Sequence, residues 1–437
     1  MISASNKFPT DPHGWAELLP ERQARQALSG AHRVPWVVVG AGFTGLACAR
    51  RLGELHPDQE ILLLDARLVA QGASGRNSGF AVAISHFDGG LEAGEMADYR
   101  RVNRINLAGL DLLRTQVRAH AIDCQWHEGG FHHAAADRHA VQECDNFLRY
   151  LNELEIPHTP LDRQALSERL GTALYQTGVH VANGVLLQPA ALVRGLADTL
   201  PANVRLYEQS PALKIEDGKP LTLHLATGEV KTDKLILTMN YEASTLGFLR
   251  SYIIGSTLSG SFTRVLSKQE LASLGSQTEW GVISLHSGGA TLRLTRDRRL
   301  CIRNTAEYHS STLLSDKELA HRQAIHRVAF DKRFPQLAQV PFEYSWSGVE
   351  GITRNNTNFF GRQRDNIYLA GGYNGSGVSR GTAFGAAIAD YASEETSQTI
   401  SDCLASAPGA WMPPRPFLDI GAFFTVHSRF RGVGLDR

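Results

Sequence analysis

The sequence predicts an α/β fold in which a domain with a parallel sheet is joined to a second, α+β domain built on an antiparallel sheet. Two continuous apolar runs, at 36–39 and 61–64, are typical of strands buried on both faces of a parallel sheet. A glycine turn and a helical stretch lie between them. Residues 251–305 contain apolar runs with partial alternation instead, which indicates antiparallel strands with one solvated face.

The glycines after the first run have the spacing of a nucleotide-binding turn. Gly40, Gly42 and Gly45 form the pattern GxGxxG between a strand and a helix. In a Rossmann-type unit the first glycine permits a tight turn and the second lets a pyrophosphate approach. The third lets helix and strand pack closely. Asp65 ends the second strand, where its carboxylate can accept a hydrogen bond from a ribose hydroxyl. The alternative is a βαβ unit that binds no ligand.

The remaining elements follow from periodicity and turn signals. We expect them, in chain order, as a helix at 95–120, a strand and a helix within 124–154, a helix at 189–200, four short strands within 204–240, the strands of 251–305, a helix at 316–334, and a strand, a glycine loop and a helix within 365–395. The last helix begins near Ser379. No element is predicted for the tail after Ser406.

The composition is that of an ordinary globular protein. Of 437 residues, 43% are hydrophobic and 20% charged, and 44 basic residues balance 44 acidic ones. Because there is no basic excess, we expect no nucleic-acid partner. The N-terminal stretch has no apolar signal region, and no apolar run is long enough to span a membrane, so a cytoplasmic protein is expected.

The cysteines and histidines predict neither a disulfide framework nor a metal site. The five cysteines are odd in number and scattered, which favours a reducing compartment: Cys48, Cys124, Cys144, Cys301 and Cys403. His127, His132 and His133 lie close in sequence. Adjacent residues of a strand point to opposite faces, and no carboxylate spacing supports these histidines, so we expect no metal.

Five segments together resemble a known family. They are "VVVGAGFTGLACARRL", "LLLDARLVAQGASGRNSGF", "LILTMNYEA", "WSGVEGITRNNTNFFG" and "IYLAGGYNGSGVSRGTAFG". They are similar to motifs of the FAD-dependent amine and amino-acid oxidoreductases, the superfamily of D-amino-acid oxidase, glycine oxidase and sarcosine oxidase. The nearest resemblance is to the branch with γ-glutamylputrescine oxidase and L-pipecolate oxidase. An NAD-linked dehydrogenase would need neither the "GASGRNSG" loop nor a second glycine loop.

The resemblance implies FAD as cofactor and a set of residues that bind it. Glycines and small residues of 72–79 allow close approach, and the polar residues of that loop contact the flavin edge and pyrophosphate. Arg76 offsets the charge of the reduced flavin, or is an exposed loop charge. The expected cofactor-binding residues are Gly40, Gly42, Phe43, Thr44, Gly45, Asp65, Ala66, Arg67, Gly72, Ala73, Ser74, Arg76, Asn77, Ser78, Ala212, Gly372, Gly375, Ser376, Gly377 and Val378.

The way FAD is held also follows from the resemblance. Relatives that bind the flavin covalently carry a cysteine soon after the "WSG" element. Residues 350–352 are Glu, Gly and Ile in this chain, so FAD is expected to bind non-covalently.

The family reaction is oxidation of a C–N bond to an imine by hydride transfer to flavin N5. A substrate carboxylate would be recognised by a planar arginine, for which Arg303 and Arg354 are the candidates, and the alternative for each is a surface salt bridge. Tyr373 is a candidate for the pocket wall, whereas Arg299 matches a position that is structural in the family. No catalytic acid or base is named, because the substrate amine only has to be neutral.

Three functional alternatives remain. An amino acid or secondary amine, with L-pipecolate-like compounds favoured, is the first substrate class. A γ-glutamylated polyamine is the second. The third alternative is a flavin-binding protein without turnover. The electron acceptor is O2 or a respiratory acceptor, and the C-terminal tail docks on its own chain or on a membrane or partner.

The domains are expected to be discontinuous in sequence. The FAD-binding domain comprises 34–125, 184–240 and 344–400, and the substrate domain comprises 126–183 and 241–343. An N-terminal arm, 1–33, and a C-terminal tail, 401–437, complete the chain.

Overall fold

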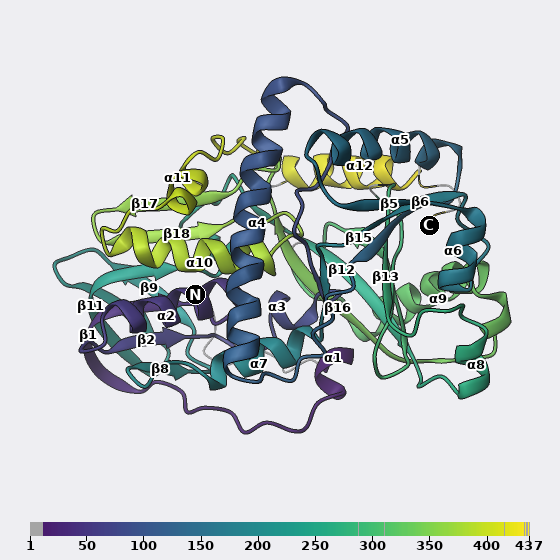
Figure 1. The fold of residues 1–437 in the computed structure, drawn as a ribbon. Helices are drawn as coiled ribbons and strands as arrows, with labels where there is room; N and C mark the ends of the chain where they lie inside the picture. The colour runs from purple at the N-terminus through teal and green to yellow at the C-terminus, as the bar shows by residue number, and fades with distance from the viewer. Residues whose placement is uncertain are drawn as a thin grey trace.

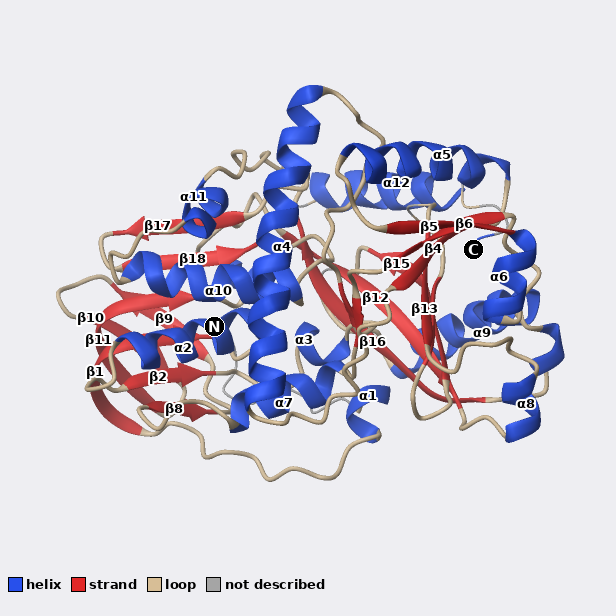
Figure 2. Ribbon diagram, in the orientation of Figure 1, coloured by secondary structure: helices blue, strands red, loops and turns tan. Residues whose placement is uncertain are grey.

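Two large sheets lie side by side in the computed structural model (Figure 1, Figure 2). The structure describes residues 12–286, 288–309, 311–414, 416–431, 433 and 436. The first eleven residues of the predicted N-terminal arm therefore lie outside the described residues. None of the described helices is long and apolar enough to cross a membrane.

The first sheet has the strand order β17-β18-β11-β1-β2-β8, with β9 and β10 attached to β11 as an antiparallel extension. Strands β18, β11, β1, β2 and β8 are parallel. The strand bounds are β1 Gly30–Val39, β2 Ile61–Leu64, β8 Val204–Tyr207, β9 Ala212–Glu216, β10 Leu221–Leu225, β11 Gly228–Leu237, β17 Phe359–Arg364 and β18 Ile367–Gly371.

The continuous apolar run of β1 is explained by burial of the strand on both faces of the sheet, as expected. Trp36 and Val38 belong to the core under the helices, whereas Val37 and Val39 belong to the core on the opposite face of the sheet. Both faces of the strand are therefore covered. Polar side chains at alternate positions would have been buried away from solvent and without a hydrogen-bond partner.

Small residues let three helices pack closely on the first sheet. Helix α10 packs against both α2 and α4. A Cβ on Gly385 of α10 would clash with the Thr44 carbonyl of α2, and one on Gly109 of α4 would clash with the Ser379 carbonyl of α10. The helices of this half are α1 Gly14–Glu17, α2 Phe43–Leu55, α3 Ala73–Arg76, α4 Ala93–Ala119, α7 Pro189–Asp198, α10 Ser379–Ala392 and α11 Gln398–Leu404, with the 3₁₀ helix η1 Asn240–Leu246.

The second sheet has the order β16-β12-β15-β14-β13-β4-β6-β5 and is antiparallel except for the β13–β4 pair. Helix α9 packs on β12, β15 and β16. The strands are β4 Phe131–Ala135, β5 His158–Asp162, β6 Thr177–Val181, β12 Ile254–Thr263, β13 Trp280–Ser284, β14 Thr291–Leu294, β15 Leu300–Glu307 and β16 Phe342–Ile352. The helices are α5 Arg138–Glu153, α6 Arg163–Leu170, α8 Lys268–Ala272, α9 Asp316–Arg333, α12 Phe417–Arg431 and the 3₁₀ helix η2 Pro335–Leu337, and a ribbon of β3 Phe80–Ala81 and β7 Val185–Leu186 completes the fold.

The predicted fold class is confirmed, and two predicted boundaries differ from the structure. The predicted boundary at 344 falls inside β16, which pairs with β12 along its length and so belongs to the second sheet. The chain returns to the first sheet only at β17. β1 likewise begins at Gly30, inside the predicted arm, because its first residues pair with those of β11. The tail, for which no element is predicted, contains α12.

A single methyl group tests the packing of β1 against α2. A Cβ on Gly45 would overlap the Gly40 carbonyl oxygen, which is backbone and cannot move aside. We expect Gly45→Ala to lower the free energy of unfolding by about 2 kcal/mol or more, measured by urea denaturation. Gly94→Ala in α4 is the control, since nothing lies within 4 Å of its added Cβ. Equal stabilities of the two variants would contradict this packing.

Candidate active site

A cavity of about 1680 Å³ lies where the strands of the first sheet end against one face of the second sheet. From the first sheet its wall includes residues that follow β1, β2, β11 and β18. From the second sheet alternate residues of a strand contribute, as Ile254, Ser256 and Leu258 do on β12. In open parallel sheets this crevice beyond the strand ends is where ligands bind.

The first glycine turn brings the start of α2 to the cavity. Gly40 has φ +105°, a conformation that favours glycine. A Cβ on Gly42 would stand 2.7 Å from Ser74 Oγ, and that hydroxyl accepts a hydrogen bond of 3.1 Å from the Phe43 amide. Gly42, the N-cap of α2, supplies no side chain to the amides of the first turn. The positive end of the helix therefore faces the cavity, where it favours an anionic group.

Asp65 organises the neighbouring loop. Its carboxylate accepts hydrogen bonds from the amides of Ala41 (2.7 Å) and Arg67 (2.8 Å). Burial raises the pKa of Asp65 to about 6, although those two amides act in the opposite direction. Arg67 in turn forms a 2.7 Å ion pair with Glu242, a wall residue that the sequence analysis does not single out.

Arg76 joins the loop to the second sheet. Arg76 is buried, with 7% of the residue's surface exposed, so the alternative of an exposed loop charge is wrong. Its guanidinium donates to the carbonyl of Gln71 (2.7 Å) and to that of Ser347 on β16 (2.9 Å). The Trp346 indole donates to the Arg76 carbonyl at 3.0 Å. These bonds fix the loop between the two sheets while Arg76 remains part of the cavity wall.

The second glycine loop is held by side chains from other strand ends. Asn240, just after β11, accepts a hydrogen bond of 2.8 Å from the Gly372 amide. Gly372 and Gly375 have φ +79° and +88°. The Tyr373 hydroxyl accepts a 2.9 Å hydrogen bond from Thr44 of α2 and so connects the two glycine loops. This hydroxyl is engaged within the first domain, although Tyr373 is a wall residue.

Three of the expected cofactor-binding residues are not in the cavity wall. Gly45 packs α2 against the turn at Gly40, and Gly372 forms the turn that Asn240 holds. The Ser376 amide donates to the Tyr373 carbonyl at 3.1 Å. These residues shape the loops, whereas the remaining expected ones line the cavity: Gly40, Gly42, Phe43, Thr44, Asp65, Ala66, Arg67, Gly72, Ala73, Ser74, Arg76, Asn77, Ser78, Ala212, Gly375, Gly377 and Val378.

The two candidate arginines have different surroundings. Arg303 projects from β15 into the cavity wall and donates a 2.6 Å hydrogen bond to Thr291 Oγ1. Burial lowers the pKa of Arg303, and Glu350 of β16 opposes this shift. Arg354 is exposed at the cavity and donates to the Trp411 carbonyl at 3.2 Å. Of the two, Arg303 is the more enclosed cation.

Glu350 is, like Glu242, a charged wall residue that the sequence analysis does not single out. Its carboxylate lies 3.5 Å from where a Cβ on Gly375 would stand, beside the second glycine loop. Gly348 and Ile352, two positions before and after it on β16, also line the cavity, as do the intervening Val349 and Gly351. Because all of residues 348–354 line the cavity, no period of two singles out Glu350, and its place in the site follows only from the pairing of β16 with β12.

The donors and shape of this site fit a dinucleotide such as FAD. The starts of α2 and α10 both reach the wall, and neither N-cap side chain satisfies the first-turn amides. Asp65 supplies an acceptor for a hydroxyl, and Gly42 leaves no room for a side chain beside Ser74. Within the described ranges, no group of three metal-binding side chains occurs.

Comparisons with known proteins agree with FAD as the cofactor. The model of the family described as "DAO: FAD dependent oxidoreductase" matches residues 35–391. The chain is 27% identical over 355 residues to gamma-glutamylputrescine oxidoreductase of Escherichia coli (strain K12), which covers 78% of this chain and 79% of the relative. It is also 27% identical over 354 residues to the probable oxidoreductase OrdL of Haemophilus influenzae, with 78% and 79% covered.

Solved structures share the fold at lower identity. Glycine oxidase from Geobacillus kaustophilus aligns with a TM-score of 0.68 and 19% identity, over 84% of this chain and 96% of that one. L-proline dehydrogenase from P. horikoshii aligns with a TM-score of 0.67 and 16% identity, over 84% and 96%. The family that the sequence motifs resemble is thereby confirmed, with FAD as its cofactor.

The pH dependence of FAD affinity tests the role expected of Asp65. A hydroxyl donor favours the ionised carboxylate, so FAD affinity should fall as the pH falls through about 6, where the unliganded carboxyl takes up a proton. Asp65→Asn should weaken binding about tenfold or more and remove this pH dependence.

Fluorescence titration of the apoprotein with FAD at several pH values measures both effects. Asp233→Asn, at an exposed ion pair on β11, is the control. A pH profile that persists unchanged in Asp65→Asn would show that another group is responsible.

Proposed function

Since the chain belongs to the DAO family of FAD-dependent oxidoreductases, we propose that it oxidises the C–N bond of an amino acid or secondary amine to an imine. Cyclic secondary amino acids of the L-pipecolate type are the substrates that we favour. The observation that carries this proposal is the enclosed cation of Arg303, in the same cavity as both glycine loops.

In the proposed arrangement, residues that follow three different strands of the first sheet bind different parts of FAD. When bound, FAD supplies the acceptor for the hydride that leaves the carbon beside nitrogen. The first turns of α2 and α10 stabilise its anionic parts, and Asp65 accepts a hydrogen bond from a hydroxyl. Arg76 adds a buried positive charge at the loop. Because no cysteine occupies 350–352, the cofactor is held without a covalent bond.

Substrate recognition is assigned to the second sheet. Arg303 is positioned by Thr291 Oγ1, which leaves its other donors to form charge-assisted hydrogen bonds with a carboxylate. Glu350, of opposite charge, lies close enough to Arg303 to act on its pKa, and it favours a substrate ammonium group beside the second glycine loop. Leu258, Trp346 and Ile352 give that part of the wall apolar surface, which excludes water from an imine product.

A γ-glutamylated polyamine is the second candidate substrate. Asp316 and Glu318, at the start of α9, form an acidic rim of the cavity wall, in which the Glu318 carboxylate also accepts hydrogen bonds from Ser315 and lies 3.0 Å from His309 Nε2. A long substrate with its carboxylate at Arg303 would extend a distal ammonium toward such a rim. The 27% identity to gamma-glutamylputrescine oxidoreductase agrees with this candidate.

A substrate panel tests the proposed reaction. Amino acids, cyclic secondary amines and glutamylated polyamines are added anaerobically to the purified holoenzyme, and loss of flavin absorbance is followed. We expect rapid bleaching by at least one carboxylate-bearing amine. Peroxide release after readmission of air distinguishes O2 from another electron acceptor. Bleaching by none of them would favour a protein that binds flavin without turnover.

The role of Arg303 is tested by comparing kcat/KM for two substrates. We expect Arg303→Gln to reduce kcat/KM for an amino acid at least about tenfold more than for the corresponding decarboxylated amine, because only the former loses a charge-assisted contact. The flavin spectrum reports whether the cofactor site is intact. Arg296→Gln, on the exposed turn between β14 and β15, is the matched control. An equal loss for both compounds would assign the carboxylate to another group.

A further inference from the structure

Residues 12–28 of the N-terminal arm, which precede β1, pack against both halves of the molecule. Their short helix α1 packs against α3, α7 and β16, so it contacts both halves of the molecule. Trp15 is fully buried, with its ring 4.6 Å from that of Phe262 and 5.1 Å from the Arg293 guanidinium. Gln188 donates a 2.7 Å hydrogen bond to the Trp15 carbonyl. No residue of 12–28 belongs to the cavity wall.

The arm binds the back of the loop whose front lines the cavity, here called the cofactor loop (residues 66–79). His13 Nε2 lies 3.1 Å from the Ala70 carbonyl. Burial lowers the pKa of His13 to about 3, so the ring is neutral and must donate its Nε2 proton to that oxygen. Ala70 has φ +72°, and a Cβ on Gly75 would clash with its carbonyl. The imidazole therefore holds a strained turn on which the position of Gly75 depends.

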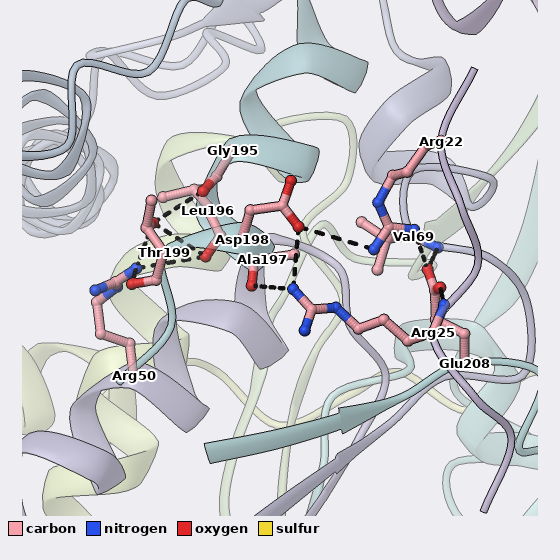
Figure 3. A network of polar contacts seen from close by, with 10 residues as sticks. All are labelled: Arg22, Arg25, Arg50, Val69, Gly195, Leu196, Ala197, Asp198, Thr199 and Glu208. Atoms are coloured by element: carbon pink, nitrogen blue, oxygen red, sulfur yellow. Dashed lines mark hydrogen bonds and ion pairs between the residues drawn. The ribbon is translucent and has the colours of Figure 1, made fainter. Parts of the chain in front are cut away.

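A buried carboxylate makes the second attachment (Figure 3). Glu208 is 0% exposed and pairs with Arg22 Nη1 at 2.6 Å. The same carboxylate accepts hydrogen bonds from the amides of Arg25 (2.5 Å) and of Val69 in the cofactor loop (2.6 Å). A buried carboxylate is costly unless it is paired, so removal of the Arg22 charge leaves Glu208 uncompensated and destabilises the arrangement that orients Val69.

We propose that residues 12–28 are a clasp that keeps the cofactor loop in its FAD-binding shape, with Arg22, Glu208 and His13 as positioning residues. Their effect on FAD is transmitted through Val69 and Ala70, since neither the arm nor Glu208 lines the cavity. Clasp docking and FAD binding are then thermodynamically coupled. If docking of the arm raises the affinity for FAD by a given factor, bound FAD must favour docking of the arm by the same factor. The inference depends on the cofactor placement proposed above.

Two arginines of the arm provide a matched comparison. Both side chains approach Asp198 of α7, Arg22 at 3.9 Å and Arg25 at 3.0 Å, and Arg25 also donates to the Ala197 carbonyl, but of the two guanidinium groups it is that of Arg22 that pairs with Glu208 (Figure 3). We expect Arg22→Ala to accelerate FAD release from the diluted holoenzyme about tenfold or more, and Arg25→Ala to change it by less than about twofold. Arg22→Lys, which keeps the charge, should recover part of the difference. The recovery of flavin fluorescence measures the release.

Hydrogen exchange of the full chain tests the reciprocal effect without any activity assay. FAD should slow exchange of the Arg25 and Val69 amides, both bonded to Glu208 in wild type, and the slowing should be lost in Arg22→Ala. Equal FAD release from Arg22→Ala and wild type would overturn the clasp. So would arm amides that exchange alike with and without FAD.

The same experiments separate this inference from the cofactor placement. If Asp65→Asn weakens FAD binding and Arg22→Ala does not, the clasp is wrong while the placement stands. If neither variant weakens FAD binding, the placement itself is wrong. Should Arg22→Ala fail to fold, Arg22→Lys and the exchange of wild-type protein with and without FAD still decide the question.

Discussion

The close contact between Gly45 and the carbonyl of Gly40 is the constraint on which the candidate site depends. Because no side chain separates them, the start of α2 is held directly against the end of β1. Thr44 can then reach the Tyr373 hydroxyl, and the Thr44 carbonyl meets Gly385 of α10. Two helix starts from distant parts of the chain therefore converge on one cavity, which is the arrangement that an anionic dinucleotide requires.

The second sheet supplies the residues that are assigned to substrate binding. It presents one face, with Arg303 and Glu350, to the crevice beyond the strand ends. The loop at Arg76 is bound to β16 through the Ser347 carbonyl and the Trp346 indole, so its geometry depends on both sheets. In the proposed function the opposite charges of Arg303 and Glu350 bind a substrate that carries both an amine and a carboxylate, so substrate specificity is assigned to the second sheet.

Short sequence motifs were sufficient to predict much of the proposed cofactor site. Gly40, Gly42, Gly45 and Asp65 are close in sequence, and their spacing alone predicts a turn, a helix start and an acceptor at a strand end. The residues that link distant segments could not be found in the same way. Glu350 and Glu242 carry no sequence pattern of their own, because their role depends on which strand or turn lies opposite them. Arg76 was expected in the correct loop, but its burial depends on β16.

The sequence by itself determined the fold class, the family and the cofactor, because apolar periodicity and glycine spacing record local backbone geometry. Only the tertiary structure decided that β16 belongs to the second sheet, since strand pairing is a contact between residues almost a hundred positions apart. It also decided that Glu208 is buried between the N-terminal arm and the cofactor loop. A carboxylate looks the same in a sequence whether it is solvated or buried, and only its neighbours in space determine which charges and amides compensate it.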